Sequence, residues 1–241
     1  MSVNMFVIIP IFFVHITFVI TAPQPSQKCS LSDSACIKAA AQPMVSVLAA
    51  GIPELGTEVL DVMHVDRIKV DLAGLKLNIR DADIKGLKHT VIDEISVDMA
   101  KKQIHMIIHA NMNLKAKYKA AGRLLILPIS GEGDTTIKLK NLEIRMNVPF
   151  ELTKNANGKD VIDLKSYKYT YDVKDNAHFH LTNLFNGNKE LSDTLHTFMN
   201  ENWKALTQEF AVPVLEQPLN KIFSTMKTYL KSQPLEDIAV V

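Results

Sequence analysis

The chain contains few of the residues from which catalytic and metal sites are often built. Its 241 residues include two cysteines, nine glycines and one tryptophan. Two cysteines cannot supply a four-thiolate zinc site. The patterns typical of serine hydrolases, zinc peptidases, P-loop proteins and dinucleotide-binding folds are also missing. We therefore expect a protein that is not an enzyme and that holds no cofactor and no metal.

An excess of charge of either sign is missing too. There are 27 basic and 26 acidic residues, which gives a net charge of +1. Because nucleic-acid-binding proteins carry a strongly basic face, we expect no nucleic-acid partner. With 47% hydrophobic and 22% charged residues, the composition is typical of a globular protein and excludes a disordered chain.

Long apolar runs are confined to the start of the chain. Residues 5–20 are almost wholly apolar, contain no Lys or Arg and lead to the small residues Thr21 and Ala22. This pattern predicts a signal peptide over residues 1–22, cleaved after Ala22 or within a few residues of it. An uncleaved anchor is the alternative, for which about 16 apolar residues are few. We expect residues 23–241 to form a single secreted, extracellular domain without stable membrane insertion.

Secretion gives the two cysteines a structural interpretation. In an oxidising compartment, Cys29 and Cys36 are expected to form a disulfide. On one helix their Cα atoms would lie about 10 Å apart, too far for a bridge. Cys29 is therefore expected in a loop that folds back onto a helix starting near Ser34. A reactive thiol pair is the alternative, but the spacing is not Cys-x-x-Cys.

Two segments have helical character. Residues 34–50 predict a helix with Ser34 as N-cap and Gly51 as its end, kinked or split at Pro43. From Asn188 onward apolar residues recur at helical spacing, which predicts a long amphipathic helix. This helix is expected to break or bend around its two prolines at 213 and 218, and residues 233–241 are expected to form a tail.

The middle of the chain, from about Leu72 to Thr182, alternates apolar and polar residues with period two. The clearest stretch, residues 103–119, would extend about 50 Å at ~3.3 Å per residue, and so long a strand must coil. A one-residue change of phase at Asn141 predicts a β-bulge. Turns are predicted at residues 131–134 and 155–158. The order indicates an antiparallel meander.

These patterns together predict the architecture. A long sheet with one apolar face needs a partner of matching length, and the C-terminal helix is the candidate. We expect an α+β fold in which a long, strongly curved antiparallel sheet wraps around this helix and encloses an elongated apolar tunnel.

Four histidines at nearby strand positions raise the question of a metal site. His105 and His109 fall on the polar face of one strand, and His178 and His180 flank Phe179. Two imidazoles on one strand face can bind a metal, but no acidic or thiolate partner lies at suitable spacing. We interpret them as part of a solvated face.

One segment resembles a known family. Residues 183–203, NLFNGNKELSDTLHTFMNENW, are similar to the signature of the insect takeout and juvenile hormone-binding protein family. In that signature an N-L-F-N-G turn opens the long helix and N-E-N-W follows. The Cys29/Cys36 pair after a signal peptide is similar to the N-terminal disulfide of the family. The resemblance covers nearly all of the predicted mature chain and does not separate the hormone-binding branch from the takeout branch.

The resemblance implies a tubular lipid-binding fold and a secreted carrier of one elongated apolar ligand, such as a juvenile hormone-like terpenoid, a fatty acid or a related lipid. It also implies that the ligand contacts are apolar side chains lining the tunnel. From the apolar faces of the predicted strands and helix, the candidate lining residues are Ile104, Met106, Ile108, Met112, Leu114, Tyr118, Ile137, Leu139, Tyr169, Tyr171, Phe198, Met199, Trp203 and Leu206.

Two alternatives stay open. The interior could be filled by its own side chains, in which case the protein would be a secreted signalling or sensory interaction protein without a ligand. A membrane-engaging lipid-transfer protein is the other alternative, and the near-zero net charge argues against attraction to anionic membranes.

Overall fold

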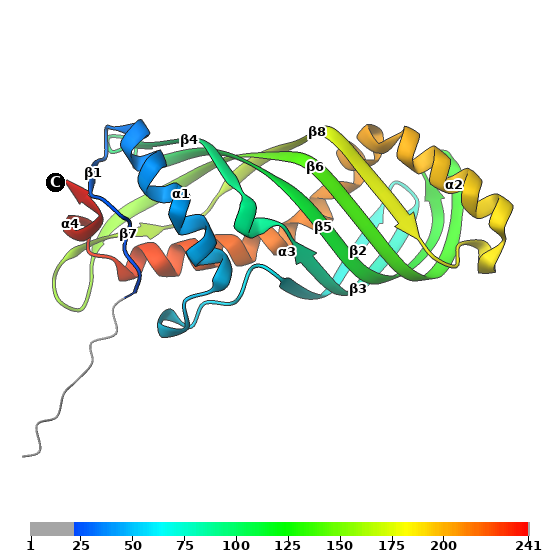
Figure 1. Cartoon of the computed structure of the whole chain (residues 1–241), viewed down its shortest axis with the longest axis horizontal. Coiled ribbons are helices and arrows are strands. Elements are labelled where there is room, and N and C mark those ends of the chain that lie inside the picture. The colour runs from blue at the N-terminus through cyan, green and yellow to red at the C-terminus, as the bar shows by residue number, and fades with distance from the viewer. Residues whose placement is uncertain (1–21, 241) are drawn as a thin grey trace, which may run out of the picture.

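A coiled antiparallel sheet wrapped around one long helix makes up most of the molecule (Figure 1). The computed structural model describes residues 22–240. Apart from Ala22, the predicted signal peptide therefore lies outside the described residues. The α+β architecture predicted from the sequence is confirmed: the sheet curves along its length and packs its inner face on the helix.

Within residues 22–240, seven strands form the main sheet. They are β2 (Met63–Leu72), β3 (Leu75–Lys85), β4 (Val91–Asp98), β5 (Gln103–Leu124), β6 (Leu127–Lys154), β7 (Asp160–Leu164) and β8 (Lys168–Leu181). The order is β2-β3-β5-β6-β7, β4 pairs with β5 and β8 pairs with β6. All of these pairings are antiparallel. A separate parallel pair joins β1 (Cys29–Ser30) to β9 (Ala239–Val240), near the two ends of the described chain.

The helices pack against the inner face and the edges of this sheet. The described helices and 3-10 turns are α1 (Ser34–Ala50), η1 (Pro53–Leu55), η2 (Leu87–His89), η3 (Phe185–Gly187), α2 (Lys189–Glu201), α3 (Trp203–Ser232) and α4 (Leu235–Ile238). Figure 1 shows α3 running along the inside of the curved sheet, with α1 near one end and α2 at the other.

The predicted bulge at Asn141 is confirmed. The register between β5 and β6 shifts between Ala110 and Met112, and β6 shifts against β8 at the same level. Asn141 has a left-handed backbone with φ of 53°, and its N–H donates to Asn111 Oδ1 at 2.9 Å. The bulge changes the phase of alternation, so apolar side chains face inward on both sides of it.

The turn predicted at residues 131–134 is wrong, because these residues lie inside β6. A Cβ atom at Gly131 would come within 2.7 Å of the Tyr118 hydroxyl, and one at Gly133 within 2.5 Å of Thr182 Oγ1. These glycines therefore allow close packing inside a strand. The turn predicted at residues 155–158 is confirmed, and it joins β6 to β7.

The predicted start of the sheet was also too late in the chain. Strand β2 begins at Met63, nine residues before the predicted boundary at Leu72. Its inward residues include Val65 and Ile68, three positions apart, and this irregular spacing hides the period-two pattern.

The helices differ from the prediction at their boundaries. The break falls at Asn202, whose side chain donates to Phe198 O at 2.8 Å, and α3 continues through both prolines. Helix α1 likewise continues through Pro43, and its N-cap is Asp33, which accepts from Cys36 N at 2.9 Å, rather than Ser34. The predicted tail instead forms α4 and β9.

Candidate functional site

An apolar cavity of about 260 Å³ lies between the sheet and the C-terminal half of α3. We call it cavity 1. Helix α1 supplies one wall, β4, β5 and β6 supply another, and α3 supplies the third. Its main lining residues are Ile37, Ala40, Ala41, Met44, Val45, Leu48, Ile92, Ile95, Val97, Ile104, Met106, Ile108, Met146, Leu219, Ile222, Thr225, Met226, Tyr229 and Leu230.

The sequence of α1 explains why this helix covers the cavity. Its lining residues begin at Ile37 and recur three, four, seven, eight, eleven and twelve positions later. This spacing places them on one stripe of a helix. The stripe contains three alanines, whose small side chains leave space beneath the helix.

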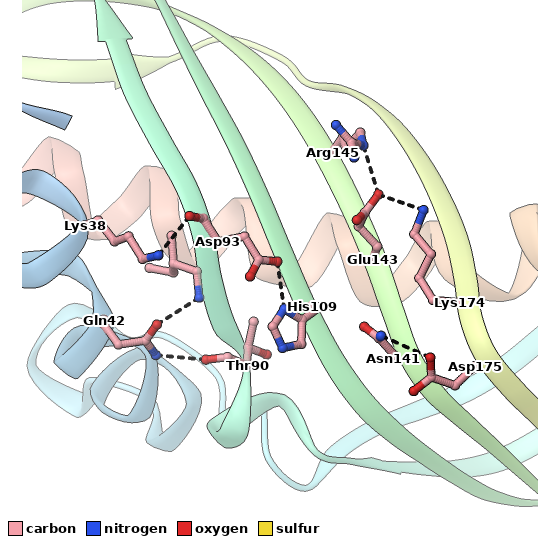
Figure 2. A network of polar contacts seen from close by, with 11 residues as sticks. Lys38, Gln42, Thr90, Asp93, His109, Asn141, Glu143, Arg145, Lys174 and Asp175 are labelled. Carbon is pink, nitrogen blue, oxygen red and sulfur yellow. Dashed lines mark hydrogen bonds and ion pairs between the residues drawn. The ribbon is translucent and has the colours of Figure 1, made fainter. Parts of the chain in front are cut away.

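Side chains that flank this stripe attach α1 to the edge strand β4, as Figure 2 shows. Gln42 Nε2 donates to Thr90 O at 2.9 Å, and Gln42 Oε1 accepts from Ile92 N at 2.8 Å. Lys38 Nζ donates to Asp93 O at 2.9 Å. The amide of Gln42 thus occupies the hydrogen-bonding positions that a further strand would take on this edge.

The N-terminal segment before α1 also borders cavity 1, through Pro25, Cys29 and Leu31. Cys29 and Cys36 form the predicted disulfide, with their Cα atoms 5.6 Å apart. It ties β1, which pairs with β9, to the first turn of α1. The hydroxyl of Tyr229 donates to Pro23 O at 2.9 Å and so connects α3 to the first described residues. Burial raises the pKa of Tyr229 to about 12, so this donor keeps its proton at physiological pH.

A second cavity, cavity 2, has a volume of about 110 Å³ and lies towards the α2 end of the molecule. The edge strand β8 and the first half of α3 contribute to its wall. Its lining residues are Leu75, Leu77, Ile79, Leu124, Ile129, Thr135, Ile137, Leu139, Phe179, Leu181, Met199, Leu206, Thr207, Phe210, Ala211, Val214 and Leu215.

Helix α2 is attached to β8 in the way that α1 is attached to β4. Asn200 Oδ1 accepts from Phe179 N at 2.8 Å, and Asn200 Nδ2 donates to Phe179 O at 3.1 Å. His196 Nε2 accepts from Leu181 N at 3.0 Å, which requires that nitrogen to be unprotonated. Burial, followed by the stacked ring of His180, holds the pKa of His196 below its ordinary value.

The bulge separates the two cavities. Cavity 1 meets β5 before the register shift, and cavity 2 meets it after the shift. At the shift itself the interior is packed by Leu142 and Ile144 from β6 and by Leu215 and Leu219 from α3. The apolar interior along the sheet thus contains two cavities that share no lining residue.

The walls are nearly free of polar groups. Among the described residues, no Asp, Glu, Lys, Arg or His lines either cavity. Their polar side chains are Thr90, Thr225 and Tyr229 in cavity 1, and Thr135 and Thr207 in cavity 2. Nor does the described part of the chain hold a cluster of three or more residues suited to a metal ion. These walls can enclose an apolar molecule and offer no nucleophile paired with a base.

Seven of the predicted lining residues lie on cavity walls. Ile104, Met106 and Ile108 line cavity 1, and Ile137, Leu139, Met199 and Leu206 line cavity 2. The other seven pack in or against the core beside the cavities: Met112, Leu114, Tyr118, Tyr169, Tyr171, Phe198 and Trp203.

Two of the tyrosines already have hydrogen-bond partners. The hydroxyl of Tyr118 donates to Thr182 O at 2.6 Å, and burial raises its pKa to about 12. The hydroxyl of Tyr171 donates to Thr207 O at 2.9 Å. The first bond joins β5 to the residue after β8, and the second joins β8 to α3.

Sequence reasoning missed the contributions of α1, of β4 and of the second half of α3 to cavity 1. The stripe on α1 was visible as a helical recurrence starting at Ile37. The contribution of β4 could not be predicted, because β4 lines cavity 1 only where α1 packs against it, and the sequence does not show which strand α1 contacts.

The N-L-F-N-G motif has a structural role. Asn183 and Asn186 adopt left-handed backbone conformations, which asparagine tolerates better than most residues. Leu184 is fully buried between them, and Asn188 caps α2 by accepting from Leu191 N. The motif thus makes the sharp turn that brings α2 back onto β8.

Comparisons with known proteins agree with this arrangement. The chain matches the family model described as haemolymph juvenile hormone binding protein over residues 8–239. It is similar to the crystal structure of Takeout 1 from Epiphyas postvittana, with a TM-score of 0.87 and 47% identity, covering 89% of this chain and 99% of that one.

Two curated relatives extend the comparison. The circadian clock-controlled protein daywake of Drosophila melanogaster is 29% identical over 216 residues, 85% of this chain and 82% of that protein. A putative beta-carotene-binding protein of Schistocerca gregaria is 24% identical over 146 residues, 59% of this chain and 58% of that protein. The fold, the disulfide, the motif at the start of α2 and the match to the family model agree, and the chain belongs to the takeout and haemolymph juvenile hormone binding protein family.

Proposed function

We propose that this protein is an extracellular carrier that takes up one elongated, uncharged apolar molecule in cavity 1. The observation that carries the proposal is the wall of that cavity. It is built from aliphatic and methionine side chains of three elements, and its volume of about 260 Å³ is near the lower end of the ~300–1,000 Å³ typical of small-molecule sites. Methionines such as Met44 and Met106 adapt their shape to the ligand.

The absence of charged lining residues narrows the ligand class. An ionised carboxylate in this cavity would lose its hydration without gaining a cationic partner, which costs several kcal/mol. We therefore expect neutral molecules such as terpenoid esters or hydrocarbons to bind more tightly than ionised fatty acids of the same length. The relatives support this class, since the family model is described by juvenile hormone binding and one relative by beta-carotene binding.

Extracellular residence belongs to the same proposal. It is supported by the signal-peptide pattern of residues 1–22, by the disulfide and by the haemolymph proteins that the family model describes. None of the helices in residues 22–240 has the length and apolar character needed to cross a membrane. Residues 23–241 are proposed to be the mature chain and to act as one domain.

The test is native mass spectrometry of the chain secreted from eukaryotic cells, followed by organic extraction and by binding assays with the emptied protein. The assays use matched pairs, each a long-chain acid and its methyl ester. Two variants identify the cavity: Ile108→Phe reduces cavity 1, and Ile137→Phe reduces cavity 2. Both replaced side chains are half-buried isoleucines on adjacent strands, so each variant is the control for the other.

We expect saturable binding of the ester, at least tenfold weaker binding of the acid at neutral pH, and a loss of affinity in Ile108→Phe only. Tighter binding of the acid would refute the neutral-ligand proposal. The absence of saturable binding to a broad panel of terpenoids, fatty acids and quinones would refute the carrier and favour the interaction protein with a filled interior.

A further inference from the structure

The hairpin that joins β5 to β6 ends in a turn without a polar residue. From Leu124 to Ile129 the chain reads Leu-Leu-Ile-Leu-Pro-Ile. Turns of this kind usually contain glycine, asparagine or aspartate. Here Leu125 adopts a left-handed conformation, with φ of 54°, that a leucine rarely adopts. The next residue, Ile126, is 78% exposed, the highest value among the exposed large hydrophobic residues of the described chain.

A second apolar hairpin tip lies beside the first. Leu72, at the end of β2, is 41% exposed, and the turn after it contacts β5 because Arg123 N donates to Gly74 O at 3.0 Å. The β5–β6 hairpin continues past this point, since Leu124 still pairs with Leu127. Figure 1 shows both turns at the α2 end of the molecule. Ile126 is therefore the apolar side chain that projects furthest along this hairpin.

We propose that these two hairpin tips form a docking site for the surface of a phospholipid membrane. A pair of tips exposes on the order of a few hundred Å², which is well below the roughly 800 Å² per partner that a stable protein interface buries. The patch is also convex. A fluid lipid surface can accept such a small, convex apolar projection, because its acyl chains rearrange around it.

The charges around the tips fit this partner. Between residues 120 and 131 the only charged side chain is Arg123, at the base of the turn. Asp71 and Lys76, at the other tip, face each other across β2 and β3 and offset one another. A single exposed guanidinium beside aliphatic residues can contact lipid phosphates while the aliphatic groups enter the acyl region.

The position of the tips decides which cavity a docked chain would hold nearest to the lipid. Leu75, Leu124 and Ile129, directly behind the turns, line cavity 2. Cavity 1, the proposed ligand site, is lined by other residues and lies towards the α1 end of the molecule. The docking proposal therefore does not depend on the proposed carrier function.

The experiment measures co-sedimentation of the delipidated mature chain with phosphatidylcholine vesicles, with and without phosphatidylserine. The test variant is Ile126→Asp. The matched control is Val59→Asp, which changes another exposed β-branched residue, 54% exposed, in the segment before the opposite end of β2. Sedimentation equilibrium of the native chain and of Ile126→Asp, without vesicles, detects self-association.

We expect the native chain and Val59→Asp to bind both kinds of vesicle, and Ile126→Asp to bind about tenfold more weakly or worse. Because vesicle binding is measured without a ligand, it can fail while the carrier function holds, and the reverse. The proposal is overturned if the native chain binds neither vesicle or if both variants weaken binding equally. Self-association that depends on Ile126 would assign the tips to a second copy and would also overturn it.

Discussion

Loss of the disulfide should lower the free energy of unfolding by an amount that can be calculated from the length of the loop it closes. We consider the variant in which Cys29 and Cys36 are both serine. The bridge closes a loop with a sequence separation of seven residues. In the chain-entropy model a loop of this size stabilises the folded state by about 2.5 kcal/mol at 25 °C. For a domain of about 220 residues, this corresponds to a decrease in Tm of about 5–10 °C.

The disulfide lies where the two ends of the described chain meet. The bridge holds β1 beside β9 and leads directly into the Asp33 cap of α1. If this segment unfolds together with the sheet, the whole decrease appears in the urea or thermal unfolding of the domain. The native chain in reductant should then unfold like the variant, while the variant itself should not respond to reductant. This comparison controls for effects of the serines.

A decrease below about 0.5 kcal/mol would refute this reasoning. It would show that the N-terminal segment opens independently of the sheet, so that closing the loop constrains only a local equilibrium. Hydrogen exchange of the α1 amides would identify that local opening.

Three further predictions concern the α2 end of the molecule. Tyr118→Phe removes the buried donor to Thr182 O and should lower the free energy of unfolding by about 1–3 kcal/mol, measured by urea denaturation. Gly131→Ala places a Cβ atom 2.7 Å from the Tyr118 hydroxyl and should cost about 2 kcal/mol in the same assay; an unchanged urea midpoint would contradict the close packing. The pKa of His196 is lowered by burial, so its contribution to stability is complete above its ordinary pKa of 6.5 and is lost as the pH falls below it. In His196→Gln this part of the pH dependence should disappear, and a pH profile parallel to that of the native chain would refute its assignment to His196.

The sheet and its bulge could be predicted because they depend on local alternation. The phase change at Asn141 is visible in the sequence, and the register of β6 shifts at this level against both β5 and β8. The turn at residues 131–134 could not be predicted correctly. Glycine indicates either a turn or a close approach, and only the fold shows that Tyr118 and Thr182 lie against Gly131 and Gly133.

The cavity walls were harder to predict than the fold. Inward-facing residues of β5 such as Ile108 and Leu114 follow the same alternation, yet the first lines cavity 1 and the second is core. The difference arises from what packs opposite each residue, which depends on α1 and α3. Sequence periodicity identifies the inner face, and the contacts between elements decide where that face remains uncovered.

The helices of this protein also protect the edges of its sheet. Gln42 of α1 bonds to the backbone of β4, Asn200 of α2 bonds to that of β8, and Gln217 of α3 donates to Arg67 O of β2 at 2.7 Å. Each of these strands pairs with a single neighbour, so its outer edge would otherwise be a template for a strand from another molecule. A side-chain amide occupies part of each of these edges, and the imidazole of His196 adds to the one on β8. The outer edges of these strands are therefore less open to pairing with a strand from another molecule.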